Sequence, residues 1–169
     1  KLGGDTTLEQ CLAEASEAGF SGIESGGKFP KNSNELLPKL KKENLKLCSG
    51  WYGAHLLKNT PKDEFELMRQ QLNLFKDCDS PCMVFAEVTN SIQGDPNTPL
   101  SKRPKLSEDD WKILISRINE ISKMMMDEGM PLAYHHHMGT VIETEKETKR
   151  LVENTKDTVK LLIDTGHML

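Results

Sequence analysis

Three consecutive histidines, His135 to His137, are the most reactive run of side chains in this sequence. We interpret residues 132–137 as a strand, and because a strand alternates its side chains, His135 and His137 face one side and His136 the other. Imidazoles titrate near neutral pH and suit general acid and base catalysis. A lone histidine in an apolar strand is more often a core residue, but three of the chain's five histidines in one run favour a functional role. The run predicts two imidazoles that face a common space.

Carboxylates near these histidines predict a metal site. Asp164 and His167 are three residues apart at the end of an apolar segment, and such a pair suits Mn²⁺, Co²⁺ or Zn²⁺. Glu143 is a second metal-ligand candidate, because a turn at Gly139 would return its carboxylate to the histidines. The structural alternatives are that Asp164 caps a helix and that Glu143 is a solvated residue in the first turn of one.

Four further residues are candidates for substrate contacts. A polar substrate needs hydrogen-bond donors and acceptors around it and often an aromatic face beneath it. Glu87 ends an apolar segment, where its carboxylate would need a cation or a hydroxyl donor to offset desolvation. For Trp51, simple packing is an equal alternative. The candidates are Lys28, Trp51, Glu87 and Gln93.

The elements that must position these residues alternate between helix and strand. Apolar residues at helical spacing, preceded by capping residues, predict the helices, and short apolar runs predict the strands. The predicted helices span residues 5–19, 33–44, 60–75, 107–125 and 144–152, and the predicted strands span 20–24, 45–49, 83–88, 132–137 and 159–163. The long connection 89–105 holds three prolines and Gly94, so regular structure is excluded there. Loops of this length often have a functional role.

This alternation predicts an α/β fold with a parallel sheet, either a barrel or a doubly wound sheet. No G-x-G-x-x-G motif follows any predicted strand, which removes the usual sign of a dinucleotide site. The candidate residues lie at strand ends, which in a (β/α)8 TIM-type barrel all meet on the face that carries active sites. We therefore expect the barrel.

Composition excludes several classes of protein and partner. The net charge of −4 gives no basic field for nucleic acid. No apolar run approaches the roughly 20 residues that span a bilayer, and the first residues lack a signal peptide, so we expect a cytoplasmic protein with no membrane partner. The four cysteines show no zinc or redox spacing and are expected to be reduced core thiols.

The same residues resemble the inosose dehydratases of the xylose isomerase-like barrel superfamily. The matching segments cover essentially the whole chain in order, and the histidine segment is the most specific of them. They are residues 2–6, 22–24, 26–30, 49–52, 86–88, 91–95, 134–144 and 164–167.

This resemblance implies a single domain over residues 1–169 that holds about strands two to six of an eight-stranded barrel and is truncated at both ends. It also implies a divalent metal, Mn²⁺ or Co²⁺, held by Glu143 and Asp164, with two further ligands beyond the end of this chain. The family is active with glutathione present, so the resemblance also implies that glutathione is an accessory thiol. Ser25 departs from the bulky apolar residue expected after Glu24. A homo-oligomeric assembly is left as an open alternative.

The function implied is a metal-dependent lyase that dehydrates scyllo-inosose (2-keto-myo-inositol), a cyclic polyol ketone, to a trihydroxycyclohexane-dione in inositol catabolism. We expect His135, His137 and His167 to perform the proton transfers, without a division into acid and base. The alternatives are a metal-dependent ketose isomerase or epimerase on the same barrel, and a non-catalytic barrel segment or sugar-binding module. An endonuclease of the same superfamily is disfavoured by the net charge.

Overall fold

The computed structural model describes residues 4–167, and residues 2 and 3 of the first matching segment lie outside this range. Within it, five parallel strands form one sheet in the order β1-β2-β3-β4-β5, and each is followed along the chain by a helix before the next strand begins. Parallel strands that pair in sequence order, each joined by a helical crossover, are the arrangement of a segment of an α/β barrel. The predicted fold class is confirmed.

All ten predicted helices and strands are present. The helices are α1 (Leu8–Glu17), α2 (Ser33–Lys42), α3 (Pro61–Asp77), α4 (Glu108–Asp127) and α5 (Glu145–Asn154), and the strands are β1 (Gly22–Ser25), β2 (Lys46–Ala54), β3 (Met83–Glu87), β4 (Leu132–His135) and β5 (Val159–Leu162). The long connection contains one short 3-10 turn, η1 (Leu100–Lys102), and a second, η2 (Thr165–His167), follows β5. No helix in the described range is long and apolar enough to cross a membrane.

Two strand ends differ from the prediction in ways that matter for the site. β2 continues past residue 49 because Trp51 to Ala54 pair in register with Val84 to Glu87 of β3. Sheet hydrogen bonds therefore override the two glycines that weaken this stretch as an isolated strand. β4 ends at His135, so His136 and His137 begin the following turn.

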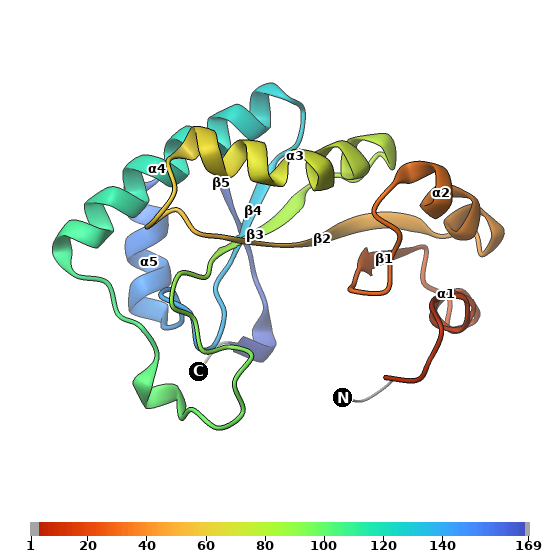
Figure 1. Cartoon of the computed structure of the whole chain (residues 1–169), viewed down its shortest axis with the longest axis horizontal. Helices are drawn as coiled ribbons and strands as arrows, with labels where there is room; N and C mark the ends of the chain where they lie inside the picture. The colour runs from red at the N-terminus through yellow and green to blue at the C-terminus, as the bar shows by residue number, and fades with distance from the viewer. Residues whose placement is uncertain (1–3, 168–169) are drawn as a thin grey trace.

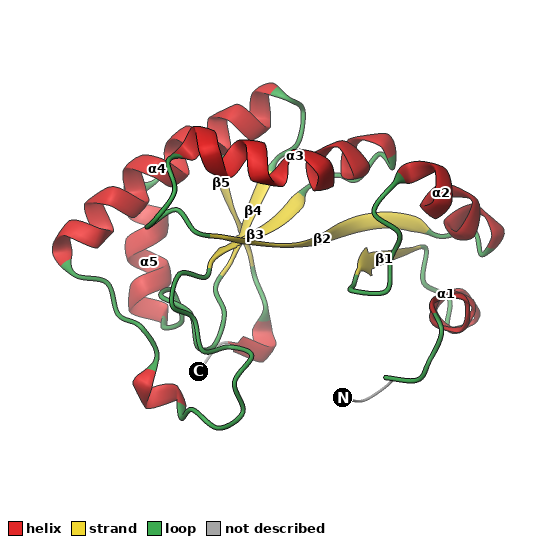
Figure 2. Cartoon of the chain, viewed as in Figure 1, coloured by secondary structure: helices red, strands yellow, loops and turns green. Residues whose placement is uncertain are grey.

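The buried core contains residues of the sheet and of all five helices, and α3 and α4 run side by side over the sheet (Figures 1 and 2). Phe85 and Tyr134 lie in this core, and both are completely buried. All four thiols are free, but the predicted place in the core holds only for Cys78, since Cys11 and Cys82 are half-buried and Cys48 is exposed. Its neighbours Leu47 and Ser49 are buried, as expected for a strand that alternates between two environments.

A capping box begins α4, the helix that was predicted over residues 107–125. The Ser107 hydroxyl accepts from the backbone N–H of Asp110 at 3.2 Å, and the Asp110 carboxylate accepts from the backbone N–H of Ser107 at 3.0 Å. We expect Ser107→Ala to lower the free energy of unfolding by about 1 kcal/mol, because it removes one half of this box. Urea unfolding of the variant, compared with Ser101→Ala in exposed η1, measures the loss. Equal midpoints for the two variants would contradict the expectation.

Candidate active site

The ends of β4 and β5 bring His135, Asp164 and His167 together. The Asp164 Oδ2 atom lies 3.2 Å from His135 Nε2 and 3.5 Å from His167 Nε2. Within the described residues, these three side chains form a group whose potential ligand atoms all lie within 4.8 Å of one another. The parallel sheet explains the meeting, because β4 and β5 are neighbours and both end at this edge.

This group has the chemistry of a divalent-cation site. His135 Nε2 is buried and has no hydrogen-bond partner, although it faces the Asp164 carboxylate. Burial and the neighbouring His137 lower the pKa of His135, which favours the neutral ring, and a neutral imidazole has one nitrogen that can bind a metal ion. The N–H of Gly166 lowers the pKa of Asp164, which stays a carboxylate. Two ligands of one ion with bonds of about 2.1 Å lie about 3 Å apart, so the observed spacing fits.

His137 completes what we call the histidine cluster: His135, His137, His167 and Asp164. Its Nδ1 lies 2.8 Å from the Met138 carbonyl oxygen, which can only accept, so Nδ1 carries the hydrogen. In the neutral ring, Nε2 then has the lone pair of a base. The ring centroid lies 4.1 Å from that of His167 and 5.4 Å from that of His135. The predicted catalytic histidines are therefore in mutual contact.

His136 lies beside His135, with 6.1 Å between the ring centroids, but it is not a member of the group of potential ligand atoms around Asp164. The alternation argument does not extend to it, because β4 ends at His135. His136 is 3% exposed and, with Glu143 and His167, lines a hollow of about 730 Å³ between α5 and β5. The Nδ1 atom of His136 has no hydrogen-bond partner.

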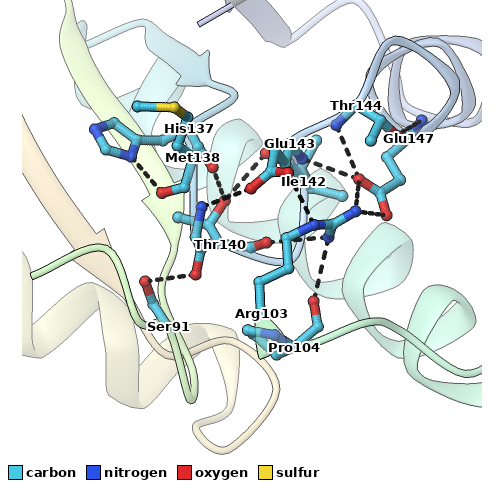
Figure 3. Close-up of polar contacts among 11 residues, drawn as sticks. Ser91, Arg103, Pro104, His137, Met138, Thr140, Ile142, Glu143, Thr144 and Glu147 are labelled. Atoms are coloured by element: carbon cyan, nitrogen blue, oxygen red, sulfur yellow. Dashed lines mark hydrogen bonds and ion pairs between the residues drawn. The ribbon is translucent and has the colours of Figure 1, made fainter. Parts of the chain in front are cut away.

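Glu143 lies in a different environment from Asp164. Its Oε1 atom forms an ion pair with Nε of Arg103 at 3.1 Å, and its Oε2 atom accepts from the backbone N–H of Gly139 at 2.7 Å (Figure 3). It is not a member of the group of ligand atoms around Asp164. A carboxylate offers about four lone-pair positions, so two contacts leave room for an ion. The role of Glu143 as a ligand stays a prediction.

Arg103 is the site residue that sequence reasoning missed. Its side chain is only 6% exposed, and its guanidinium contacts the carboxylates of both Glu143 and Glu147 (Figure 3). An arginine is seldom buried unless it is paired. Arg103 lies in the proline-containing loop 89–105, but the acidic residue of that loop, Asp95, bonds Thr98 instead, so the loop sequence does not predict the partners of Arg103.

Of the predicted substrate contacts, Trp51 lies at the histidine cluster. Its ring meets those of His135 and His137 edge-on, each at 5.3 Å between centroids. Gln93 is exposed in the loop whose backbone lies against Gly139.

Glu87 and Lys28 lie in other surroundings. Glu87 is fully buried, its Oε1 accepts from the backbone N–H of Thr89, and its Oε2 has no partner. Burial raises the pKa of Glu87. Lys28 donates to the backbone oxygens of Gly4 and Thr6 near the start of the described chain. For all four residues, substrate binding stays a prediction.

Comparison with known proteins identifies the family. A model of the xylose isomerase-like TIM barrel family matches residues 12–169. The chain belongs to this family. The resemblance inferred from the motifs is thereby confirmed, together with the fold that it implied.

Two relatives of known name are similar to this chain over nearly its whole length. An inosose dehydratase from Geobacillus thermodenitrificans is 37% identical over all of this chain and 57% of its own length. The rhizopine catabolism protein MocC from Rhizobium meliloti is 39% identical over 99% of this chain and 51% of its own. The chain thus spans about half the length of the curated relatives it matches.

Solved structures show the same fold at lower identity. A probable 3-DHS dehydratase, AsbF, from Bacillus anthracis superposes with a TM-score of 0.73 at 17% identity, over 96% of this chain and 59% of its own. A D-psicose 3-epimerase from Clostridium cellulolyticum gives 0.68 at 16% identity, over 94% of this chain and 58% of its own.

Proposed function

We propose that this chain carries part of the active site of a metal-dependent dehydratase that removes water from scyllo-inosose or a closely related cyclic polyol ketone. The observation that supports this most directly is the histidine cluster, which joins three imidazoles and one carboxylate at the end of a parallel sheet. Dehydration next to a ketone needs one group that takes a proton and one that gives a proton, and the cluster offers both. The relatives named inosose dehydratase support the choice of substrate.

The metal would be held by Asp164 with His135, which replaces the proton transfer expected of His135 from the sequence, because its Nε2 faces Asp164. Glu143 stays a predicted further ligand. A bound divalent ion would polarise the ketone oxygen and stabilise negative charge on it. Mn²⁺ and Co²⁺ suit mixed carboxylate and imidazole ligands, and Zn²⁺ is an alternative.

The side chains of this segment would perform the proton transfers. His137 Nε2 accepts the proton from the carbon beside the ketone, since its Nδ1 hydrogen is committed to the Met138 carbonyl. His167, whose ring contacts that of His137, donates a proton to the hydroxyl on the next carbon. That C–O bond breaks, water leaves, and the enol that remains becomes the 1,2-diketone. The Trp51 ring offers an apolar surface beside the two histidines.

A direct assay of the full-length protein tests this function. We expect scyllo-inosose to give a diketone that absorbs in the ultraviolet, with one water lost per turnover. Chelation should abolish turnover and added Mn²⁺ or Co²⁺ should restore it, because the ketone loses its electrophilic partner without the ion. Assays with and without glutathione test the predicted thiol.

Two results would contradict the proposal. A product that is an isomer of the substrate, with no water lost, would indicate an epimerase or isomerase instead. A full-length protein that binds none of Mn²⁺, Co²⁺ or Zn²⁺ and turns over no inosose would indicate a non-catalytic barrel.

A further inference from the structure

The long loop 89–105 is attached to the histidine segment at Gly139. The Gly139 carbonyl accepts from the Ser91 hydroxyl at 3.1 Å and from the Ile92 backbone N–H at 3.0 Å. Gly139 has φ +79°, and a Cβ there would lie 2.9 Å from the backbone nitrogen of Gln93. This position therefore requires glycine on two independent grounds.

Arg103, at the other end of the loop, forms a second attachment. Its Nη2 contacts both carboxylate oxygens of Glu147, at 2.8 and 3.0 Å, and its Nη1 donates to the Thr140 carbonyl at 3.3 Å (Figure 3). With the ion pair from Nε to Glu143, one planar guanidinium joins α5 to the turn that precedes it. Lysine has no such fork and could hold only some of these partners.

The turn connects Arg103 to His137 through short hydrogen bonds. The Thr140 hydroxyl lies 2.8 Å from the His137 carbonyl and 3.0 Å from the Ile142 carbonyl, which also accepts from the His137 backbone N–H at 3.0 Å. Glu143 holds the same turn from its far end, through the Gly139 N–H. Arg103 therefore contacts the turn directly at Thr140 and indirectly through Glu143.

We propose that Arg103 is a positioning residue, which fixes the turn of residues 137–143 and so orients the His137 ring in the histidine cluster. The inference rests on the proposed function in assigning His137 a proton transfer, but the mechanical part does not depend on the reaction. His137 itself has left the regular part of β4, which ends at His135. The hydrogen bonds of the turn, with Arg103 attached, replace the sheet as its support.

This role predicts a specific kinetic pattern in the full-length protein. Arg103→Ala should lower kcat by about 10²-fold, because misplacement of a catalytic group by about 1 Å has effects of that size. KM should change much less, since Arg103 does not lie among the predicted substrate contacts. Arg103→Lys should recover part of the loss, and guanidinium ions added to Arg103→Ala should recover part as well.

Arg150 provides a matched control. It also forms a two-pronged contact with a carboxylate, that of Glu108, at 2.8 and 2.7 Å, and its guanidinium lies over the ring of Trp111. This pair joins α4 and α5 at the exposed surface, away from the turn. Arg150→Ala should leave kcat unchanged and should show no rescue by guanidinium.

Hydrogen exchange of the full-length protein tests the mechanical part independently of any reaction. In Arg103→Ala, the backbone amides of residues 137–143 should exchange at least about tenfold faster than in the wild type, because local opening becomes easier. Arg150→Ala should leave that segment unchanged. If Arg103→Ala does not fold, Arg103→Lys and Glu147→Gln serve in its place, with smaller effects in the same direction.

The outcomes separate the two proposals. Unchanged exchange in the turn, or an active Arg103→Ala enzyme with wild-type kcat, would overturn the positioning role. Faster exchange in the turn with no inosose turnover even by the wild type would leave the mechanical role standing and contradict the proposed function.

Discussion

His137→Asn should lower turnover of the full-length protein by about 10²- to 10⁴-fold, the range that a positioned general base contributes. Asparagine can place an amide nitrogen near the position of Nδ1 and keep the bond to the Met138 carbonyl. It has no basic group in place of Nε2. The variant should thus bind metal and substrate nearly as the wild type does, while the proton transfer fails.

Two control measurements make this result specific to His137. Metal content per protein and the unfolding midpoint of His137→Asn should match the wild type, because Asp164 and His135 remain in place. Normal turnover in this variant would remove His137 from the mechanism. Lost metal together with lost turnover would instead assign the ring a ligand role.

Asp164→Asn should lower metal affinity by about 10²-fold or more, since loss of a mere hydrogen-bond partner of a ligand already costs about 10- to 100-fold. Among residues 4–167, Asp164 is the carboxylate that lies within reach of both His135 and His167. An amide there keeps the shape and removes the charge. The change is measured by removing metal from the protein with a chelator and then titrating the metal-free protein with Mn²⁺ or Co²⁺ in a calorimeter.

Two comparison variants give this measurement its meaning. Asp157→Asn changes an exposed carboxylate just before β5 and should leave metal affinity as it is. Glu143→Gln tests the remaining ligand prediction: a loss as large as that of Asp164→Asn would assign Glu143 to the ion, and an unchanged affinity would leave it as a partner of Arg103. Equal affinities for Asp164→Asn and wild type would contradict the proposed metal site.

Much of the fold could be predicted from the sequence because its signals are local. Apolar residues at helical spacing from Trp111 to Met125, preceded by the capping residue Ser107, predict the helix at 107–125, and this helix is confirmed. The extension of β2 to Ala54 could not be predicted this way, because it depends on pairing with β3 some thirty residues away. The end of a strand cannot be predicted from its own residues where pairing with another strand determines it.

The site was predictable to the extent that its residues are neighbours in sequence or lie at strand ends. His135, His137, Asp164 and His167 meet because parallel neighbours end at one edge, and that follows from topology. Arg103 was missed because its partners Glu143 and Glu147 are about forty residues away and no periodic pattern connects them. A folded loop alone brings these charges together.

The contact of Trp51 with two imidazoles has a practical consequence. The chain has two tryptophans, and Trp111, a residue of α4, is 5% exposed and lies in the core. Trp51 lies with its ring 5.3 Å from His135 and from His137, where a change in charge on either imidazole alters the electric field at the indole. The fluorescence of Trp51 therefore allows the binding of a metal ion or substrate at the histidine cluster to be followed in real time without any label.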